Sequence, residues 1–359
     1  MAMRKYSERL GSLSDEQLQA ALHRFDLGIF LQAEAIPFGS FGQNVFITSS
    51  KGRFVLRGDP HFPWQFPTEQ YYVQQLHEHT QVPVPWPYLI DYQHDIFGWS
   101  YVIMPRMDGL SLEDPQVQSL LSKEDLYALA HVLGENLAQM QELTWPFPGR
   151  YNTAASTIQP FDLRTELAWP FPVASDTQDT PLSSTSTFSE FILTPLRHRL
   201  ASTCTKNTIT KADLNWAEKL IADAQEALLI DFQPCFVTGD YKTGNLVVSR
   251  ESGNWRVSGV FDLMAAHFGD GEADLSRAAA VYIDEDPQLA YTFIQAYVNK
   301  KPPRPGFARR FQIYMLLERH IIWSFCHEHG LVSWCKQWTF REWVSRYISF
   351  QLPPLDEAR

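Results

Sequence analysis

Three oxygen-bearing side chains, Asp240, Asn245 and Asp262, are the strongest candidates for chemistry in this sequence of 359 residues. Asp240 and Asn245 are five residues apart in a glycine-containing loop, and an apolar run follows it at once. A Ser-Gly-Asn turn then leads into RVSGVFD, so the pattern predicts a β-hairpin with all three side chains at its mouth. Phosphoryl transfer needs such a set, because one carboxylate accepts the proton of an attacking hydroxyl while a carboxylate and an amide hold magnesium. The alternative is a purely structural hairpin with acidic loop ends.

The order D-x-x-x-x-N, hairpin, D resembles the catalytic signature of protein kinases and of their antibiotic- and choline-phosphorylating relatives. After Asp262 the chain continues with a GD pair and a DL pair, and this spacing is similar to that of the aminoglycoside phosphotransferase family. The resemblance implies that Asp240 is the catalytic base and that Asn245 and Asp262 bind Mg²⁺. It also implies that Asp274 braces the loop and does not touch substrate.

Two loop residues differ from the usual pattern of these antibiotic kinases. Thr238 stands two residues before Asp240, where the family usually has a histidine with a scaffold role, so loop geometry is affected more than chemistry. Lys242 follows Asp240 by two residues, as in many protein kinases. We expect Lys242 to neutralise charge on the transferring phosphoryl group and count it as catalytic together with Asp240.

The N-terminal part of the chain supplies candidates for binding ATP. Gly39 and Gly42 lie in a turn-rich loop and allow backbone N–H groups to approach phosphates, although an ordinary hairpin turn is the alternative. Arg57 ends the strand-like run RFVLR, where the resemblance implies a phosphate-binding cation. Glu69, in the next expected helix, is then the ion-pair partner of Arg57; the alternative for both is a solvated surface pair.

The stretch MPRMDG follows a buried strand and looks like the hinge between the lobes of a kinase. The resemblance implies that adenine is bound there by the C=O of Pro105 and the N–H of Met107. Proline offers only an acceptor, which suits the first of these positions. A plain connecting turn is the alternative.

The order of the expected elements is a small strand-rich region, a Pro/Gly break and a large helical region. We therefore expect an α+β, bilobal protein-kinase-like fold with a ligand-binding cleft between its lobes. The nucleotide-binding lobe would span residues 1–104, the hinge 105–109 and the helical lobe 110–359 with the acceptor site. Residues 150–210, which include a Ser/Thr/Asp-rich stretch, form a variable insertion in this scheme.

Charge bears on the class of acceptor. The formal net charge of −11 argues against nucleic-acid binding and fits a protein that attracts cationic small molecules. Four carboxylates after the hairpin are candidates for acceptor binding, with solvated loop residues as the alternative: Asp270, Glu272, Asp284 and Asp286. With ATP and Mg²⁺ as cofactors, we expect a small-molecule hydroxyl acceptor, first an aminoglycoside or related antibiotic, second a choline-like, sugar or amino-alcohol metabolite. A catalytically silent nucleotide-binding module is the remaining alternative.

The compartment is predicted from what the chain does not contain. Its first 17 residues are polar where a secretory signal would be apolar, and no apolar run approaches the roughly 20 residues of a membrane span. The four cysteines show no CxxC spacing and are too sparse for a disulfide scaffold. We expect a cytoplasmic protein without a membrane partner, and no oligomeric state is predicted.

Overall fold

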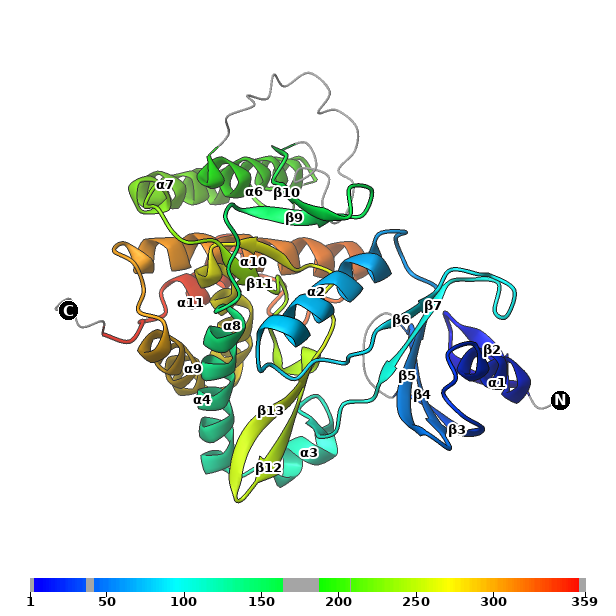
Figure 1. Cartoon of the computed structure of the whole chain (residues 1–359). Coiled ribbons are helices and arrows are strands. Elements are labelled where there is room, and N and C mark those ends of the chain that lie inside the picture. The colour runs from blue at the N-terminus through cyan, green and yellow to red at the C-terminus, as the bar shows by residue number, and fades with distance from the viewer. Residues whose placement is uncertain (1–2, 37–41, 164–186, 207, 355–359) are drawn as a thin grey trace. The chain divides into compact units, whose positions relative to one another are not determined.

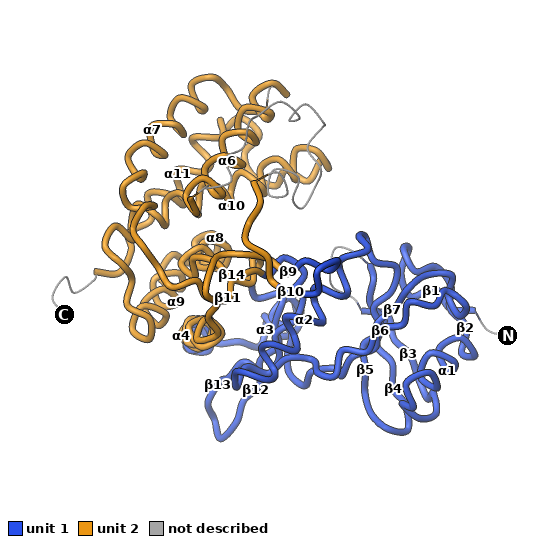
Figure 2. The backbone as a smooth tube through the Cα atoms, turned by 45° about the horizontal axis from the view of Figure 1, so that its top comes forward, with its two compact units in different colours: residues 1–129, 151–157, 242–266 blue, residues 130–150, 158–241, 267–359 orange. Residues whose placement is uncertain are grey.

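The computed structural model describes residues 3–36, 42–163, 187–206 and 208–354. Its backbone divides into two compact units, coloured separately in Figure 2. Unit 1 comprises residues 1–129, 151–157 and 242–266. Unit 2 comprises residues 130–150, 158–241 and 267–359. The division into functional lobes that meet at residues 105–109 stays a prediction.

Unit 1 holds most of the strands (Figure 1). These are β1 (Met3–Ser7), β2 (Gly11–Ser14), β3 (Phe30–Ala35), β4 (Asn44–Ser49), β5 (Gly52–Gly58), β6 (Leu89–Asp91), β7 (Tyr101–Pro105), β8 (Leu110–Ser111), β12 (Leu246–Glu251) and β13 (Asn254–Val260). Its helices are α1 (Asp15–Arg24), α2 (Gln65–His79), α3 (Pro115–Leu120), the start of α4 (Lys123–Met140) and the 3₁₀ turn η1 (Thr243–Asn245).

In the described part of unit 1, five antiparallel strands pair in the order β3-β4-β5-β7-β6. The runs VFITSS and RFVLR pair with each other as the antiparallel strands β4 and β5. Along β4 buried and half-buried residues alternate, because successive side chains of a strand point to opposite faces. Val45 and Ile47 therefore reach the same core as Leu18 and Leu22 of α1. Burial of this apolar surface is what holds helix and sheet together.

Helices α1 and α2 begin differently. A capping box opens α1, with Ser14 bonded to the backbone of Gln17 and the Gln17 side chain bonded back. Helix α2 begins at Gln65, and Pro67 occupies its first turn. Proline is tolerated there because the first N–H groups of a helix have no intrahelical partner.

Unit 2 is mainly helical. Besides the rest of α4 it contains α6 (Phe188–Thr205), α7 (Lys211–Leu228), α8 (Leu275–Glu285), α9 (Pro287–Lys300), α10 (Phe307–His329), α11 (Phe340–Ile348) and the 3₁₀ turn η2 (Gly271–Asp274). Helix α10 contacts α7, α8 and α11 (Figure 1) and so forms the centre of this helical part. A sheet in the order β10-β9-β14-β11 consists of β10 (Thr157–Pro160), β9 (Gly149–Asn152), β14 (His267–Gly269) and β11 (Cys235–Val237).

The predicted insertion at residues 150–210 contains β10, α6 and most of β9, while residues 164–186 lie outside the described residues. Among the helices described, none combines the length and the apolar character needed to cross a membrane.

Candidate active site

The open end of the β12–β13 hairpin brings Asn245 and Asp262 together. Leu246 pairs with Val260 at the end of the ladder, and the N–H of Phe261 donates to the C=O of Asn245 at 3.0 Å. Asn245 and Asp262 therefore leave the two strands at the same edge, as the sequence predicted. Their amide and carboxylate oxygens are the hard ligands that Mg²⁺ prefers, so this pair fits a magnesium ion.

Asp262 has an unusual backbone conformation. Its φ of 64° lies in the left-handed region, which few residues other than glycine adopt and which Asp tolerates better than most. Such conformations persist where surrounding contacts impose them, and they cluster at functional sites. The contacts of Asp262 described next supply that constraint.

Arg57, at the end of β5, joins Asp262 to helix α2. One guanidinium nitrogen donates to both carboxylate oxygens of Glu69, at 2.7 and 3.0 Å, and the other terminal nitrogen donates to Oδ1 of Asp262 at 3.0 Å. Arg57 and Glu69 are buried, with 6% and 1% of their surfaces exposed. The predicted ion pair is therefore present, and the alternative of a solvated surface pair is wrong. The link to Asp262 was not predicted.

Charge is distributed unevenly across this buried network. Burial raises the pKa of Glu69 to about 7, although Arg57 and the hydroxyl of Tyr88, which also donates to Glu69, oppose this. Burial also acts to raise the pKa of Asp262, but Arg57, Glu69 and the charge of Lys242 together bring it below its ordinary value. Asp262 is thus the ionised carboxylate of the pair. Tyr88 was missed because a tyrosine in an apolar stretch gives no sequence signal.

Asp240 lies in unit 2, since the chain passes from unit 2 to unit 1 between Tyr241 and Lys242. The loop before it is fixed by Asp274, whose carboxylate accepts from the N–H of Thr238 at 2.6 Å and from that of Gly239 at 2.9 Å. The Thr238 hydroxyl also donates to Asp274 and accepts from the N–H of Asp240. The predicted bracing role of Asp274 is confirmed, and Thr238 takes part in it through its hydroxyl.

Gly239 is required for the shape of this loop. Its φ of 75° is left-handed, and a side chain there would be strained. Burial raises the pKa of Asp274 to about 6, although the three donors from Thr238 and Gly239 favour its charged form. The result is a rigid turn that presents Asp240 immediately after β11.

Arg277, in the first turns of α8, is a site residue that sequence reasoning missed. Its Nε lies 2.9 Å from Oδ1 of Asp240, and another of its nitrogens donates to Glu318 of α10. An arginine three residues after Asp274 resembles any solvated helix residue in sequence. The contacts of Arg277 with Asp240 and Glu318 become visible only in the folded chain, where α8 packs against α10.

Of the two hinge candidates, Pro105 is the last residue of β7 and Met107 follows it by two residues. Pro105 pairs with Phe54 of β5, and the N–H of the next residue, Arg106, donates to the C=O of Arg53 at 3.0 Å. The side chain of Met107 packs on Gly259 so closely that a Cβ there would lie 2.6 Å from the Met107 Cβ. Binding of adenine by Pro105 and Met107 remains a prediction.

The glycine loop is described only in part. Gly39 lies outside the described residues. Gly42 has a left-handed φ of 60°, and its C=O accepts from the hydroxyl of Ser7 in β1 at 2.6 Å. The N-terminal hairpin thus anchors one end of this loop. The phosphate-binding role of Gly39 and Gly42 stays a prediction.

Two carboxylates of the predicted acceptor site, Asp270 and Glu272, are buried, with 4% and 5% of their surfaces exposed. Glu272 accepts from Arg310 at 2.7 and 2.9 Å, and Asp270 accepts from Arg304 and from the hydroxyl of Tyr314. These contacts favour an internal role over binding of the acceptor.

The other two acceptor candidates also have partners. Asp284 accepts from the hydroxyl of Tyr347 at 2.9 Å and from Arg346 at 3.3 Å. Asp286 caps α9 by accepting from the N–H of Gln288 at 2.9 Å. Whether either carboxylate meets an acceptor remains a prediction.

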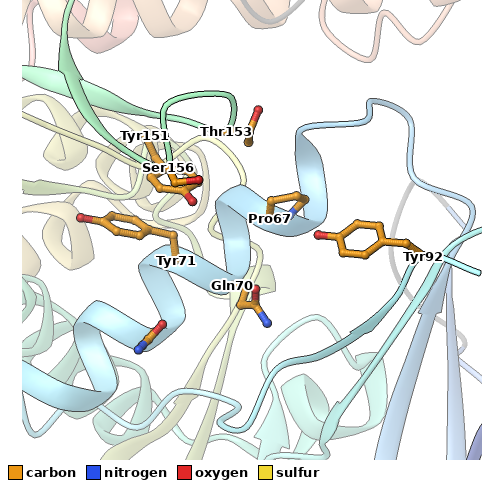
Figure 3. A pocket seen from close by; sticks show the side chains of 8 residues that line it. Pro67, Gln70, Tyr71, Tyr92, Tyr151, Thr153 and Ser156 are labelled. Carbon is orange, nitrogen blue, oxygen red and sulfur yellow. The ribbon is translucent and has the colours of Figure 1, made fainter. Parts of the chain in front are cut away.

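A pocket with a volume of about 300 Å³ lies on unit 1, and none of the site residues named above lines it (Figure 3). Tyr71 and Tyr151 stack at a ring separation of 4.2 Å, and Tyr92 lies on the other side of Pro67 and Gln70. Its lining consists of Pro67, Gln70, Tyr71, Gln74, Tyr92, Tyr151, Thr153 and Ser156, without a charged group. It therefore offers no carboxylate and no cation for phosphoryl transfer.

Comparison with known proteins gives one family match. The family model described as "Phosphotransferase enzyme family" matches residues 32–310. No match was found among curated proteins.

Solved structures share the fold of this chain at low identity. A putative fructosamine-3-kinase from Haemophilus somnus 129PT is 13% identical, with a TM-score of 0.55 and coverage of 92% of this chain and 95% of that one. A mutant of aminoglycoside phosphotransferase APH(4)-Ia in complex with ADP and hygromycin B is 12% identical, with a TM-score of 0.55 and the same coverages. A GDP and kanamycin complex of an APH(2") enzyme is 13% identical, with a TM-score of 0.56 and coverages of 94% and 97%. The predicted α+β, protein-kinase-like fold is confirmed.

Proposed function

The chain belongs to the phosphotransferase enzyme family, and from that premise we propose that it transfers the γ-phosphoryl group of ATP to a hydroxyl of a small molecule. The observation that carries the proposal is the buried network in which Arg57 bonds both Glu69 and Asp262. This network joins a candidate phosphate-binding cation to a candidate metal ligand. An ordinary hairpin with acidic loop ends would not require a buried arginine at its mouth.

Each part of the constellation has a proposed role. Asp240, held by the loop that Asp274 fixes, accepts the proton of the acceptor hydroxyl or orients that hydroxyl. Asn245 and Asp262 hold Mg²⁺ through oxygen ligands. Bound MgATP supplies the phosphoryl group and the charge neutralisation by the metal. Lys242 adds a positive charge for the transferring group.

ATP binding is proposed for residues of unit 1. Arg57 provides a fixed cation for the phosphates, and Glu69 keeps its guanidinium in place. Gly39 and Gly42 offer backbone N–H groups to the phosphates. Pro105 and Met107 bind adenine through their backbones. The ADP and GDP complexes of structural neighbours support a nucleotide site of this kind.

For the acceptor we propose an aminoglycoside or a related cationic antibiotic. The net charge of −11 supports a cation, and the neighbouring structures with hygromycin B and kanamycin support this compound class. A role in antibiotic resistance and a cytoplasmic location accompany this choice. The second choice is a sugar or amino-alcohol metabolite, which the fructosamine-3-kinase neighbour favours.

The test is MgATP consumption by the purified chain with a panel of hydroxylated compounds. We expect turnover with a cationic acceptor and a rise in its KM as salt increases, because the Debye length falls from about 30 Å at 0.01 M to about 10 Å at 0.1 M. ATP is kept saturating so that only the acceptor responds. A KM that does not change with salt would move the proposal to neutral metabolites, and absence of turnover with every class would contradict the kinase assignment.

A further inference from the structure

Asp240 has a cationic neighbour whose own position is fixed from behind. Nε of Arg277 lies 2.9 Å from Oδ1 of Asp240, and the guanidinium also donates to Glu318. All three side chains are mostly enclosed, with 22%, 29% and 13% of the side-chain surface exposed for Arg277, Asp240 and Glu318. We propose that Arg277 is a positioning residue that orients the Asp240 carboxylate for phosphoryl transfer and is itself held in place by Glu318. This inference rests on the proposed function.

Glu318 is a firm anchor for Arg277. It lies on α10 and bonds to both Arg277 and Arg319. Burial acts to raise the pKa of Glu318, but Arg319 and Arg277 outweigh burial and lower it. Arg319 is fixed in turn, because its guanidinium lies 4.8 Å from the ring centre of Tyr347. Glu318 therefore stays charged and holds one side of Arg277, while Nε of Arg277 lies 2.9 Å from Oδ1 of Asp240.

The shape of the guanidinium explains why this residue is an arginine. A planar fork can bond two carboxylates at once in fixed directions, whereas an ammonium group is a single point of charge. Arg277 spans Asp240 on one side and Glu318 on the other. A lysine at this position would retain the charge but would fix the carboxylate direction less well.

Asp240 lies between a carboxylate and a cation. The carboxylate of Asp274 in η2 repels the charge of Asp240, while Arg277 of α8 attracts it. Glu318 and Arg319 of α10 lie behind Arg277 and largely neutralise each other. Removing Arg277 takes away the cation that lies 2.9 Å from Oδ1 of Asp240 and opposes the repulsion from Asp274. A positively charged neighbour within 4–6 Å ordinarily lowers a carboxyl pKa by about 1–3 units.

The test compares Arg277→Met, Arg277→Lys and the control Arg319→Met, which removes the second arginine that bonds Glu318. For Arg277→Met we expect kcat to fall about 10–100-fold at neutral pH and the acid limb of the kcat profile to move up by about one pH unit. In Arg277→Lys, the acid limb of the kcat profile should lie close to its wild-type pH, whereas kcat itself should stay below the wild-type value. An acid limb that stays in place in Arg277→Met, or moves equally in Arg319→Met, would overturn the inference.

A second readout does not depend on turnover. The carboxyl carbon of Asp240 can be titrated by NMR in aspartate-labelled protein, with Asp240→Asn identifying its signal. We expect the midpoint to rise in Arg277→Met and to return toward wild type in Arg277→Lys. An unchanged midpoint in Arg277→Met would overturn the inference about Arg277 but not the proposed function. Full turnover in Asp240→Asn would contradict the proposed function, and the titration would then still test the Asp240–Arg277 pair.

Discussion

Replacing Glu272 with glutamine should destabilise unit 2 strongly. Arg310 is 1% exposed, and two of its five N–H groups donate to Glu272 while the other three donate to backbone carbonyls of Ala227, Arg304 and Pro305. A glutamine at this position keeps one acceptor oxygen for Arg310 and places its NH₂ group against the second N–H of Arg310. The buried charge of Arg310 then lacks its closest counter-ion. Removing one partner of a buried pair costs about 3–5 kcal/mol. Loss of one or two charge-assisted bonds at about 1.5–3 kcal/mol each gives a similar figure.

Calorimetry measures this effect. For a unit of about 200 residues, each kcal/mol changes Tm by about 2–4 °C, so we expect Glu272→Gln to lower Tm by about 10 °C. The matched control is Glu218→Gln, which removes the same charge from the exposed pair with Arg197 and should cost less than about 1 kcal/mol. Equal Tm values for the two variants would refute the reasoning. An unchanged Tm with a raised acceptor KM in Glu272→Gln would show that Glu272 meets the acceptor.

Three further predictions concern Arg57, Asn245 and Asp274. Arg57→Lys should raise the KM for ATP about tenfold, because the charge is kept but the bidentate fork is lost; steady-state kinetics at saturating acceptor checks this, and an unaltered KM would remove Arg57 from phosphate binding. Asn245→Ala should raise the Mg²⁺ concentration for half-maximal turnover about tenfold, and a metal titration with an unchanged midpoint would exclude this ligand. The pKa of Asp274 is raised to about 6 in the folded chain, from an ordinary value of 3.8, so its stabilising effect is greatest below about pH 4 and is lost as pH rises through 6. Asp274→Asn should remove this part of the pH dependence of the unfolding free energy, by about 3 kcal/mol at most, and identical slopes in both proteins would contradict it.

Local sequence patterns predicted the parts of the site that lie in or beside one hairpin. The turn between β12 and β13 and the alternation of their residues fix the strand register, and the register places Asn245 and Asp262 at one edge. The Arg57–Glu69 pair, which joins a strand to the next helix, was predicted from the resemblance to the kinase family and not from a local pattern.

Contacts between distant helices could not be predicted in this way. Asp240 and Arg277 are joined only when α8 packs beside the loop after β11, and Glu318 reaches them from α10. Asp270 and Glu272 were predicted as acceptor-binding carboxylates or solvated loop residues, because nothing near them in sequence indicates their buried pairs with Arg304 and Arg310. A charged side chain looks the same in sequence whether its partner is water or an arginine from another helix.

The most direct test of the central claim is γ-phosphoryl transfer by Asp240→Asn under single-turnover conditions with MgATP and the best acceptor. Asparagine keeps the size of the side chain but cannot accept the proton. We predict that the rate falls about 10²–10⁴-fold, while Tm falls by no more than a few degrees because the Asp240–Arg277 pair is partly exposed. Transfer at the wild-type rate in a folded Asp240→Asn protein would contradict the account.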